Sequence, residues 1–180
     1  MKSTDIRTGK EDKHAHGVEP HIWNSTRNAA ILAENIYKVL CELDPASKSY
    51  FHQRLDSLEK EIQTTDNEVQ ELMEHADQAF LIYHPALSYF AKDYGVKQIS
   101  IEEGGKEPSP AHLQELIRTC RENQVRIIFV QQEFDVRNAE LIAKELGVQV
   151  VSINPLSYHW KEEMLKVARA LSNPDKNSGV

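Results

Sequence analysis

The chain has 180 residues, 40% of them hydrophobic and 27% charged, so it is long enough to bury an ordinary core. Its formal net charge is −7, with 21 basic residues scattered among 28 acidic ones, which argues against nucleic acid as a partner because phosphate binding needs a concentrated basic face. No apolar run is long enough for a membrane helix, and residues 1–17 lack the apolar core of a signal peptide. A mature exported protein would lack that peptide too, so the compartment stays open.

A polar arm and a first helix are predicted at the start of the chain. Residues 1–23 are mostly polar and carry several histidines, and we treat them as one unit. Asn24 or Ser25 can cap the helix that follows, which Asp44 and Pro45 end. Its apolar residues fall on one helical stripe, formed by Leu32, Ile36, Val39 and Leu43.

A second, longer helix is predicted to follow. Its apolar positions repeat at alternating spacings of four and three, at Phe51, Leu55, Leu58, Ile62, Thr65, Val69, Leu72 and Ala76. A pattern of about 31 residues gives a helix of roughly 45 Å. A coiled-coil segment is one interpretation, but the repeat stops abruptly at Asp77, which favours a single helix packed along a domain. Residues 24–77 are therefore predicted to be a helix and a long linker helix.

From residue 78 the pattern changes to short, branched, nearly continuous apolar runs that alternate with helical stretches. The runs cover residues 79–83, 97–101, 126–130 and 148–153, and the helical stretches cover 86–94, 110–122, 136–146 and 159–171. Strands that alternate with helices predict a parallel sheet, and unbroken apolar strands predict burial on both faces. The fold class is therefore α/β, with a four-stranded parallel sheet flanked by helices over residues 78–173 and a tail over 174–180. Cys41 and Cys120 both fall in helical patterns and are predicted to be buried thiols rather than a disulfide.

Polar residues follow several of the predicted strands. His84 ends the first strand, Glu133 lies just past the third, and Asn154 ends the fourth. Ligands of open parallel sheets meet the carboxyl ends of the strands, so these three side chains can converge on one rim. Neutral imidazole is a common ligand for zinc and similar metals. His84 can equally be a strand-end residue that caps the next helix.

Other histidines are further candidates for the same chemistry. His21 lies between Pro20 and two large apolar residues, and it is either a ligand or a turn residue held by its neighbours. His14 and His16 form an H-x-H pair that can capture metal or be solvated, and His159 near Asn154 is an outside candidate.

Catalytic motifs are missing from the sequence. It contains no G-x-S-x-G, P-loop, G-x-G-x-x-G or H-E-x-x-H arrangement, so we do not expect an enzyme.

Several motifs together resemble one known family. "EPHIWNS" (19–25) resembles the D-P-H-[IV]-W-[LM]-[SD] motif of the metal-specific substrate-binding proteins of ABC importers, the zinc and manganese receptors. "YHPALSYFAKDYGVKQISI" (83–101) is similar to their H-x-A-[FL]-x-Y-[FL]-x-[KR]-x-Y-G-[LV] segment. The stretch 107–156 is similar to their E-P-[ST]-…-I-F-x-[ED]-x-x-F-[SD] segment, which leads to a [LI]-D-P-L-like motif. The order is consistent from about residue 14 to 171, and the combination is what makes the resemblance specific.

The resemblance implies a metal site and a transport role. His21 and His84 correspond to two of the family's metal-ligating histidines, and His14 and His16 fall where many zinc-type members carry a His-rich loop. The family implies two α/β lobes joined by a stiff long helix, with little closure. It also implies metal bound between the lobes, delivery to a membrane permease, and a periplasmic or cell-surface location.

Three departures limit the carry-over. Nothing before residue 14 can be the family's amino-terminal lobe, so we expect linker helices and a carboxy-terminal lobe only. Asn154 replaces the usual Asp, which makes it a less certain third ligand, and Glu19 replaces another Asp.

The main hypothesis is a solute-binding component, or a fragment of one, that binds Zn²⁺ through histidines and passes it to an ABC permease. Mn²⁺ is the alternative cation, although it prefers oxygen ligands. An apolar face left by the missing lobe would favour a homodimer. Two rival hypotheses are an adhesin-like interaction protein without metal and a metal-dependent hydrolase with Glu133 as its base.

Overall fold

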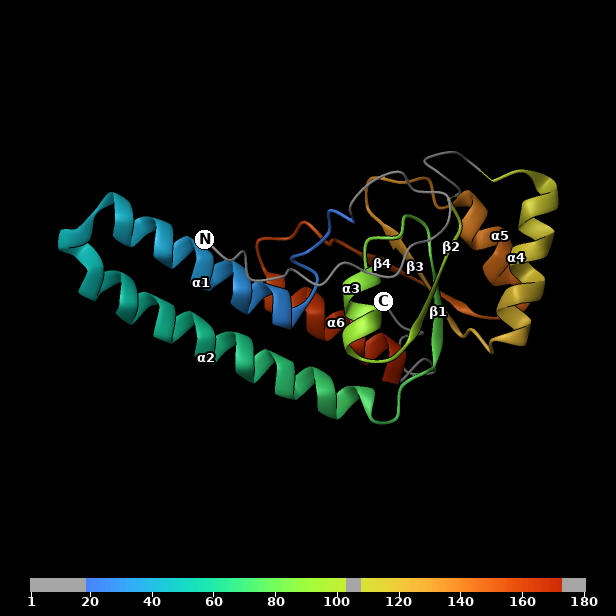
Figure 1. Ribbon diagram of the computed structural model, residues 1–180. Coiled ribbons are helices and arrows are strands. Elements are labelled where there is room, and N and C mark those ends of the chain that lie inside the picture. Colours follow the sequence, from blue (N-terminus) through green and yellow to red (C-terminus); the bar gives the residue numbers. More distant parts are fainter. Residues whose placement is uncertain (1–18, 103–107, 173–180) are drawn as a thin grey trace.

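The computed structural model describes residues 19–102 and 108–172. Its described part consists of a long helical hairpin and an α/β lobe at one end of that hairpin (Figure 1). No helix in these two ranges is long and apolar enough to cross a membrane.

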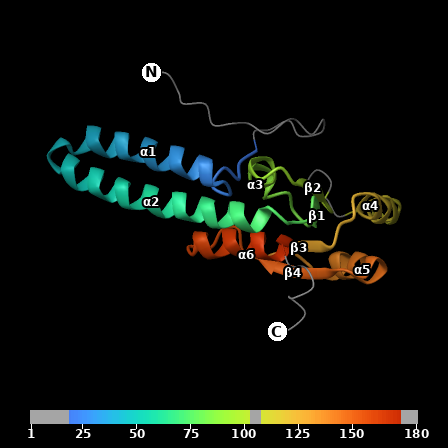
Figure 2. The same cartoon turned by 90° about the horizontal axis from the view of Figure 1, so that it is seen from below.

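The hairpin is formed by α1 (Thr26–Leu43) and α2 (Lys48–Met73), which run antiparallel (Figures 1 and 2). Ser25 caps α1, since its hydroxyl accepts a hydrogen bond from the amide of Asn28 at 3.0 Å. A short 3₁₀ turn, η1 (Pro45–Ser47), joins the helices, and the side chain of Asp44 caps it. Helix α2 begins only after this turn and ends at Met73. It therefore has 26 residues and is shorter than the pattern of about 31 residues predicted.

The predicted four-stranded parallel sheet is confirmed. Its strands are β1 (Ala79–Ile82), β2 (Lys97–Ser100), β3 (Ile127–Gln131) and β4 (Gln149–Ile153), in the order β2-β1-β3-β4. All neighbouring pairs are parallel, with Leu81 opposite both Ile99 and Ile128. Strand β1 therefore lies between β2 and β3, and the three carboxyl ends share one edge of the sheet.

Helices cover both faces of the sheet. They are α3 (Ser88–Asp93), α4 (Pro110–Glu122), α5 (Arg137–Leu146) and α6 (Trp160–Ser172). Side chains alternate along β1, so Phe80 packs in the cluster under α3, α6 and the lobe end of α2, whereas Leu81 packs under α4 and α5. Gly147 ends α5 with a φ of 70°, in the left-handed region that glycine adopts without strain.

The two cysteines are free thiols in different settings. Cys120 is buried as predicted, and burial raises the pKa of its thiol to about 11. Cys41 is only partly buried, so that prediction was wrong for this residue. It lies near the far end of α1, where the hairpin projects beyond the lobe (Figure 1).

Candidate metal-binding site

His84 stands at the carboxyl end of β1 and is fixed by its neighbour β3. The backbone carbonyl of His84 accepts a hydrogen bond from Gln131 Nε2 at 2.6 Å, and its amide donates to Gln131 Oε1 at 3.3 Å. The Gln131 side chain is almost fully buried, so both of its polar groups are used in holding this strand end. The imidazole stacks on Phe134 with ring centroids 5.5 Å apart.

The other neighbour, β2, supplies a carboxylate to the same ring. Glu102 follows β2, and its Oε2 lies 2.8 Å from Nδ1 of His84. A carboxylate can only accept, so this contact selects the neutral tautomer in which Nδ1 donates and Nε2 has the lone pair. A ring oriented in this way by a carboxylate is typical of metal-ligating histidines.

His21 has the same arrangement on a separate segment. Its backbone amide donates to Glu19 Oε1 at 3.0 Å, and its Nδ1 contacts the same oxygen. The other oxygen, Oε2, accepts from the hydroxyl of Ser88 at 3.0 Å, and Tyr89 donates to the Glu19 carbonyl at 3.1 Å. Burial acts to raise the pKa of Glu19, but the hydrogen bonds from His21 outweigh it and hold the pKa below its usual value. Glu19 is therefore an ionised acceptor.

The two imidazoles meet at the rim of the sheet. Their ring centroids are 5.1 Å apart with an interplanar angle of 75°. The side chains are 16% exposed for His21 and 30% for His84, so the pair is sheltered but open on one side. Because each Nδ1 is engaged by a carboxylate, each ring has Nε2 as the nitrogen that can bind a metal ion.

Two tryptophans connect the His21 segment to the loop after β4 and to the start of α6. Trp23 Nε1 donates to the carbonyl of Pro155 at 2.8 Å, and Trp160 Nε1 donates to the carbonyl of Trp23 at 2.8 Å. Asn24 Nδ2 donates to the carbonyl of Ala86 at 2.9 Å, beside the loop that carries His84. The relative position of the two rings is thus fixed by contacts on both sides.

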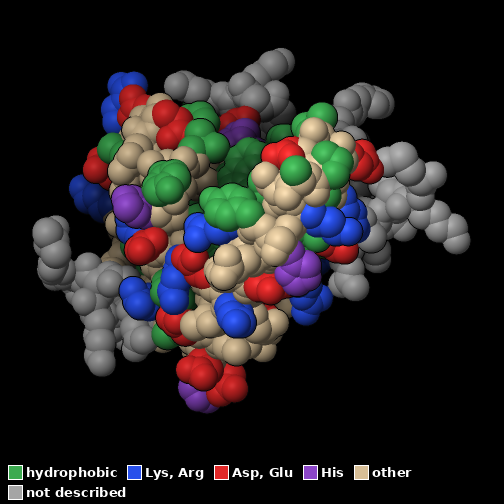
Figure 3. All heavy atoms as spheres, turned by 90° about the vertical axis from the view of Figure 1, so that its left-hand side faces the viewer, with side chains coloured by type: hydrophobic (Ala, Val, Ile, Leu, Met, Phe, Trp, Pro, Cys, Tyr) green, Lys and Arg blue, Asp and Glu red, His purple; other side chains and the backbone are tan. Residues whose placement is uncertain are grey.

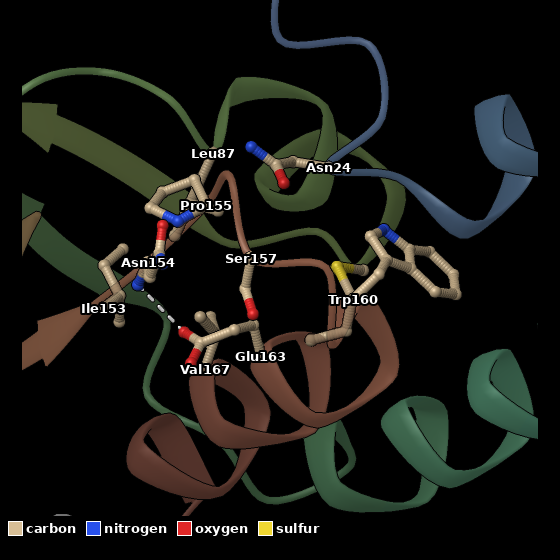
Figure 4. Close-up of a pocket in the computed structure, with 10 residues that line it drawn as sticks. Asn24, Leu87, Ile153, Asn154, Pro155, Ser157, Trp160, Glu163 and Val167 are labelled. Atoms are coloured by element: carbon tan, nitrogen blue, oxygen red, sulfur yellow. Dashed lines mark hydrogen bonds between the residues drawn. The ribbon is translucent and has the colours of Figure 1, made fainter.

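Asn154 takes part in a turn beside a small cavity. Its Oδ1 accepts from the amide of Leu156 at 3.2 Å, and its own amide donates to Glu163 Oε2 at 2.9 Å (Figure 4). Trp160 and Asn24 line the same cavity. A metal-ligating role for Asn154 stays a prediction.

Other candidate residues do not join the histidine pair. Over residues 19–102 and 108–172, no group of three or more His, Cys, Asp and Glu side chains is arranged to hold a metal ion. Glu133 is exposed on the turn after β3, and His159 is exposed and packs edge-on against Tyr158. His14 and His16 lie outside the described residues.

Sequence reasoning missed Glu102 and Gln131, which hold His84 from either side. His84 was found because polar residues at the carboxyl ends of parallel strands share one rim. The same rule could have made Gln131 and Glu102 candidates, since Gln131 is the last residue of β3 and Glu102 closely follows β2. The sequence pointed to Glu19 only because it stands where the family motif has Asp, and no contact was predicted for it.

A helical hairpin joined to a parallel α/β lobe is the architecture of one class of substrate-binding protein. A crystal structure of ZnuA matches 95% of this chain with a TM-score of 0.88 and 31% identity, and the match covers 67% of the ZnuA chain. The family described as zinc-uptake complex component A, periplasmic, matches residues 2–171. The chain therefore belongs to this family.

Individual relatives extend the comparison. The zinc-binding lipoprotein AdcA of Streptococcus pneumoniae R6 is 31% identical over 170 residues, which are 93% of this chain. The match spans only 34% of AdcA, so the chain corresponds to about a third of that relative. The laminin-binding adhesin Lmb of Streptococcus agalactiae is 26% identical, with a TM-score of 0.82 over 92% of this chain and 67% of its own.

Proposed function

We propose that this chain is the metal-binding component, or part of one, of an ABC importer for zinc or a related divalent cation, with His21 and His84 as ligands. The observation that carries the proposal is the imidazole pair at 5.1 Å, in which each Nδ1 is engaged by a carboxylate. The names of the relatives support it, since ZnuA and AdcA are described as zinc-uptake and zinc-binding proteins.

The chemistry of the pair favours zinc over manganese. Zinc takes imidazole nitrogens in sites of about four ligands, whereas manganese prefers oxygen. Glu19 and Glu102 are occupied as acceptors for the ring Nδ1 atoms, so the nitrogens are the groups offered to the metal. Two imidazoles leave coordination positions open, which suits a cation that must be released to a permease. Asn154 is a weaker candidate for a third position.

Titration calorimetry on chelator-stripped protein tests the assignment. Zinc should bind the unaltered chain, and His84→Ala or His21→Ala should weaken binding at least tenfold because each removes one of two ligands. His159→Ala is the matched control, since this exposed imidazole lies apart from the pair, and it should bind as the unaltered chain does. No heat with zinc, or equal heat in His84→Ala, would contradict the proposal.

An exported location and a permease partner follow from the same proposal. The family is a periplasmic one, and the relative AdcA is a lipoprotein. We infer that this chain also acts outside the cytoplasm and hands its cation to a membrane permease. We expect no catalysis, because the carboxylates nearest the imidazoles already accept hydrogen bonds from them.

A second candidate function is adhesion on the same scaffold. It is favoured by Leu156 and Tyr158, which are 69% and 97% exposed on the loop between β4 and α6, and by the similarity to a laminin-binding adhesin. Binding to immobilised laminin should then be weakened by Tyr158→Ala and unchanged in the doubly substituted His21→Ala/His84→Ala chain. If the His21→Ala/His84→Ala chain lost laminin binding while Tyr158→Ala retained it, a metal-independent adhesin would be contradicted.

A further inference from the structure

The ring of Phe134 lies against both residues that follow β1. Its centroid is 5.0 Å from that of Tyr83, with an interplanar angle of 26°, and 5.5 Å from that of the His84 imidazole, with an angle of 20°. Both pairs are therefore stacked rather than edge-on. Tyr83 is 5% exposed and belongs to the hydrophobic cluster under α4 and α5. Phe134 thus connects a buried ring of the core with the imidazole of a candidate metal ligand.

An apolar side chain near a site does not have a role merely because it is there. Exposed apolar side chains occur elsewhere on this protein, and the face seen in Figure 3 carries several between its charged groups. Leu43, which belongs to the apolar stripe of α1, is 77% exposed, and Leu141 on α5 is 55% exposed. Phe134 differs from these residues because it is partly buried and its ring packs on the imidazole of His84.

The turn after β3 holds Phe134 in this position. The amide of Phe134 donates to the carbonyl of Gln131 at 3.1 Å, which closes a four-residue turn directly after the strand. The side chain of the same Gln131 binds the amide and the carbonyl of His84. Because β3 is the neighbour of β1, one residue at its end fixes both the backbone of His84 and the turn that carries the stacked ring.

Phe134 restricts a motion of the His84 ring that its hydrogen bonds leave open. Gln131 fixes the backbone, and Glu102 holds Nδ1 through one hydrogen bond at 2.8 Å. The χ2 torsion of histidine has a broad energy minimum, so a ring held by one hydrogen bond can still turn about the direction of that bond. A flat ring stacked on one face opposes this rotation, because turning would lose contact between the two faces or force their atoms together.

We propose that Phe134 is a positioning residue for zinc binding, which keeps the plane of the His84 imidazole fixed so that Nε2 points in one direction before the metal binds. This role rests on the function proposed above, in which His84 is a ligand. A metal ion needs the lone pair of the nitrogen to lie along the bond to the metal, so a ring that is free to turn must be ordered on binding, at a cost in affinity. Phe134 acts only through the ring of His84.

Competition between the chelator-stripped chain and a chromophoric chelator for zinc tests the proposal. Phe134→Leu keeps an apolar side chain but removes the flat ring, and the zinc affinity should fall about tenfold. Phe134→Tyr restores a flat ring and should bind zinc as the unaltered chain does. Phe51→Leu is the matched control and should also bind normally, since Phe51 is partly buried but its ring packs against Tyr50, with centroids 5.9 Å apart, instead of a histidine.

Proton NMR of the metal-free chain gives a readout that does not depend on zinc. The ring current of a stacked phenyl group shifts the imidazole protons of His84 upfield. This shift should disappear in Phe134→Leu and remain in Phe134→Tyr and Phe51→Leu. The far-ultraviolet circular dichroism of all three variants should match that of the unaltered chain, which separates the position of one ring from the integrity of the fold.

The outcomes distinguish this role from the proposed function. An unaltered chain that binds no zinc would overturn the proposed function, and the role of Phe134 with it. Zinc binding by the unaltered chain with an equal affinity in Phe134→Leu would overturn the role of Phe134 alone. An equal loss in Phe51→Leu, or a loss that Phe134→Tyr does not restore, would also overturn it, because neither result depends on a flat ring against His84.

Discussion

The carboxylates behind the two histidines decide which nitrogen each ring presents. Glu19 uses both of its oxygens, one for His21 and one for Ser88 on the segment that carries His84. The family pattern favours Asp at this position. Its side chain is one methylene shorter, so its carboxylate would lie closer to the backbone. The longer side chain therefore joins the two histidine-bearing segments as well as orienting one ring. Glu102 is the corresponding group for His84 but binds it directly from the neighbouring strand end.

Removing Glu102 should weaken zinc binding without removing a ligand. Glu102→Ala takes away the acceptor for Nδ1 of His84, so the ring loses its fixed tautomer and orientation, and the affinity should fall about 10–100-fold. Competition with a chromophoric chelator measures this loss.

The matched control for Glu102→Ala is Glu133→Ala, which removes an exposed carboxylate after the adjacent strand end and should leave the affinity unchanged. Equal losses in the two variants would indicate a general charge effect instead of an oriented ring.

A loss of esterase or phosphoesterase activity in Glu133→Gln would revive the hydrolase hypothesis.

Among the elements, the start of α1 is fixed by a partly buried polar cluster. The hydroxyl of Tyr94 donates to Asp66 Oδ1 on α2 at 2.8 Å, and Thr26 donates to the same oxygen at 2.6 Å. Burial, with the charge of Asp66, raises the pKa of Tyr94 above its usual range, so the hydroxyl stays a donor. This cluster joins the start of α1, the middle of α2 and the end of α3.

Tyr94→Phe should therefore destabilise the chain by about 1–2 kcal/mol, because it removes the hydroxyl and leaves the buried Thr26 and the partly buried Asp66 less well satisfied. Urea unfolding followed by circular dichroism measures the change. Tyr158→Phe removes the same atom from a side chain that is 97% exposed, and its free energy of unfolding should stay that of the unaltered chain. A similar loss in both variants would refute a specific role for the cluster.

The elements were predictable to the extent that their own residues determine them. Continuous apolar runs identified all four strands, because a strand that is buried on both faces has apolar side chains at nearly every position. The cover of the α1 stripe was not predictable, since periodicity shows that a helix is amphipathic but not what packs on it. At His84 the limit is partial: the position of Glu102 and Gln131 at or just after strand ends could have made them candidates, but their contacts with His84 depend on β1 lying between β2 and β3, an order that the chain sequence does not state. The meeting of His21 with His84 followed from the family resemblance rather than from spacing.

For the molecule as a whole, the candidate site lies where the segment before the hairpin meets the α/β lobe. Segment 19–25 leads into the hairpin, yet it is fastened to the loop after β1 by Asn24 and to the loop after β4 by Trp23. The imidazole pair exists only while these segments are in place, so unfolding separates the two rings. Zinc that binds the pair must then stabilise the folded chain.

Zinc at a hundredfold excess over its dissociation constant should add about 2.7 kcal/mol to the free energy of unfolding. The chelator-stripped chain, unfolded in urea with and without zinc, gives this difference directly. In the doubly substituted His21→Ala/His84→Ala chain the added stability should disappear, whereas His159→Ala should retain it. If zinc stabilised the double variant as much as the unaltered chain, its binding group would lie elsewhere, and the pair would be a feature of packing alone.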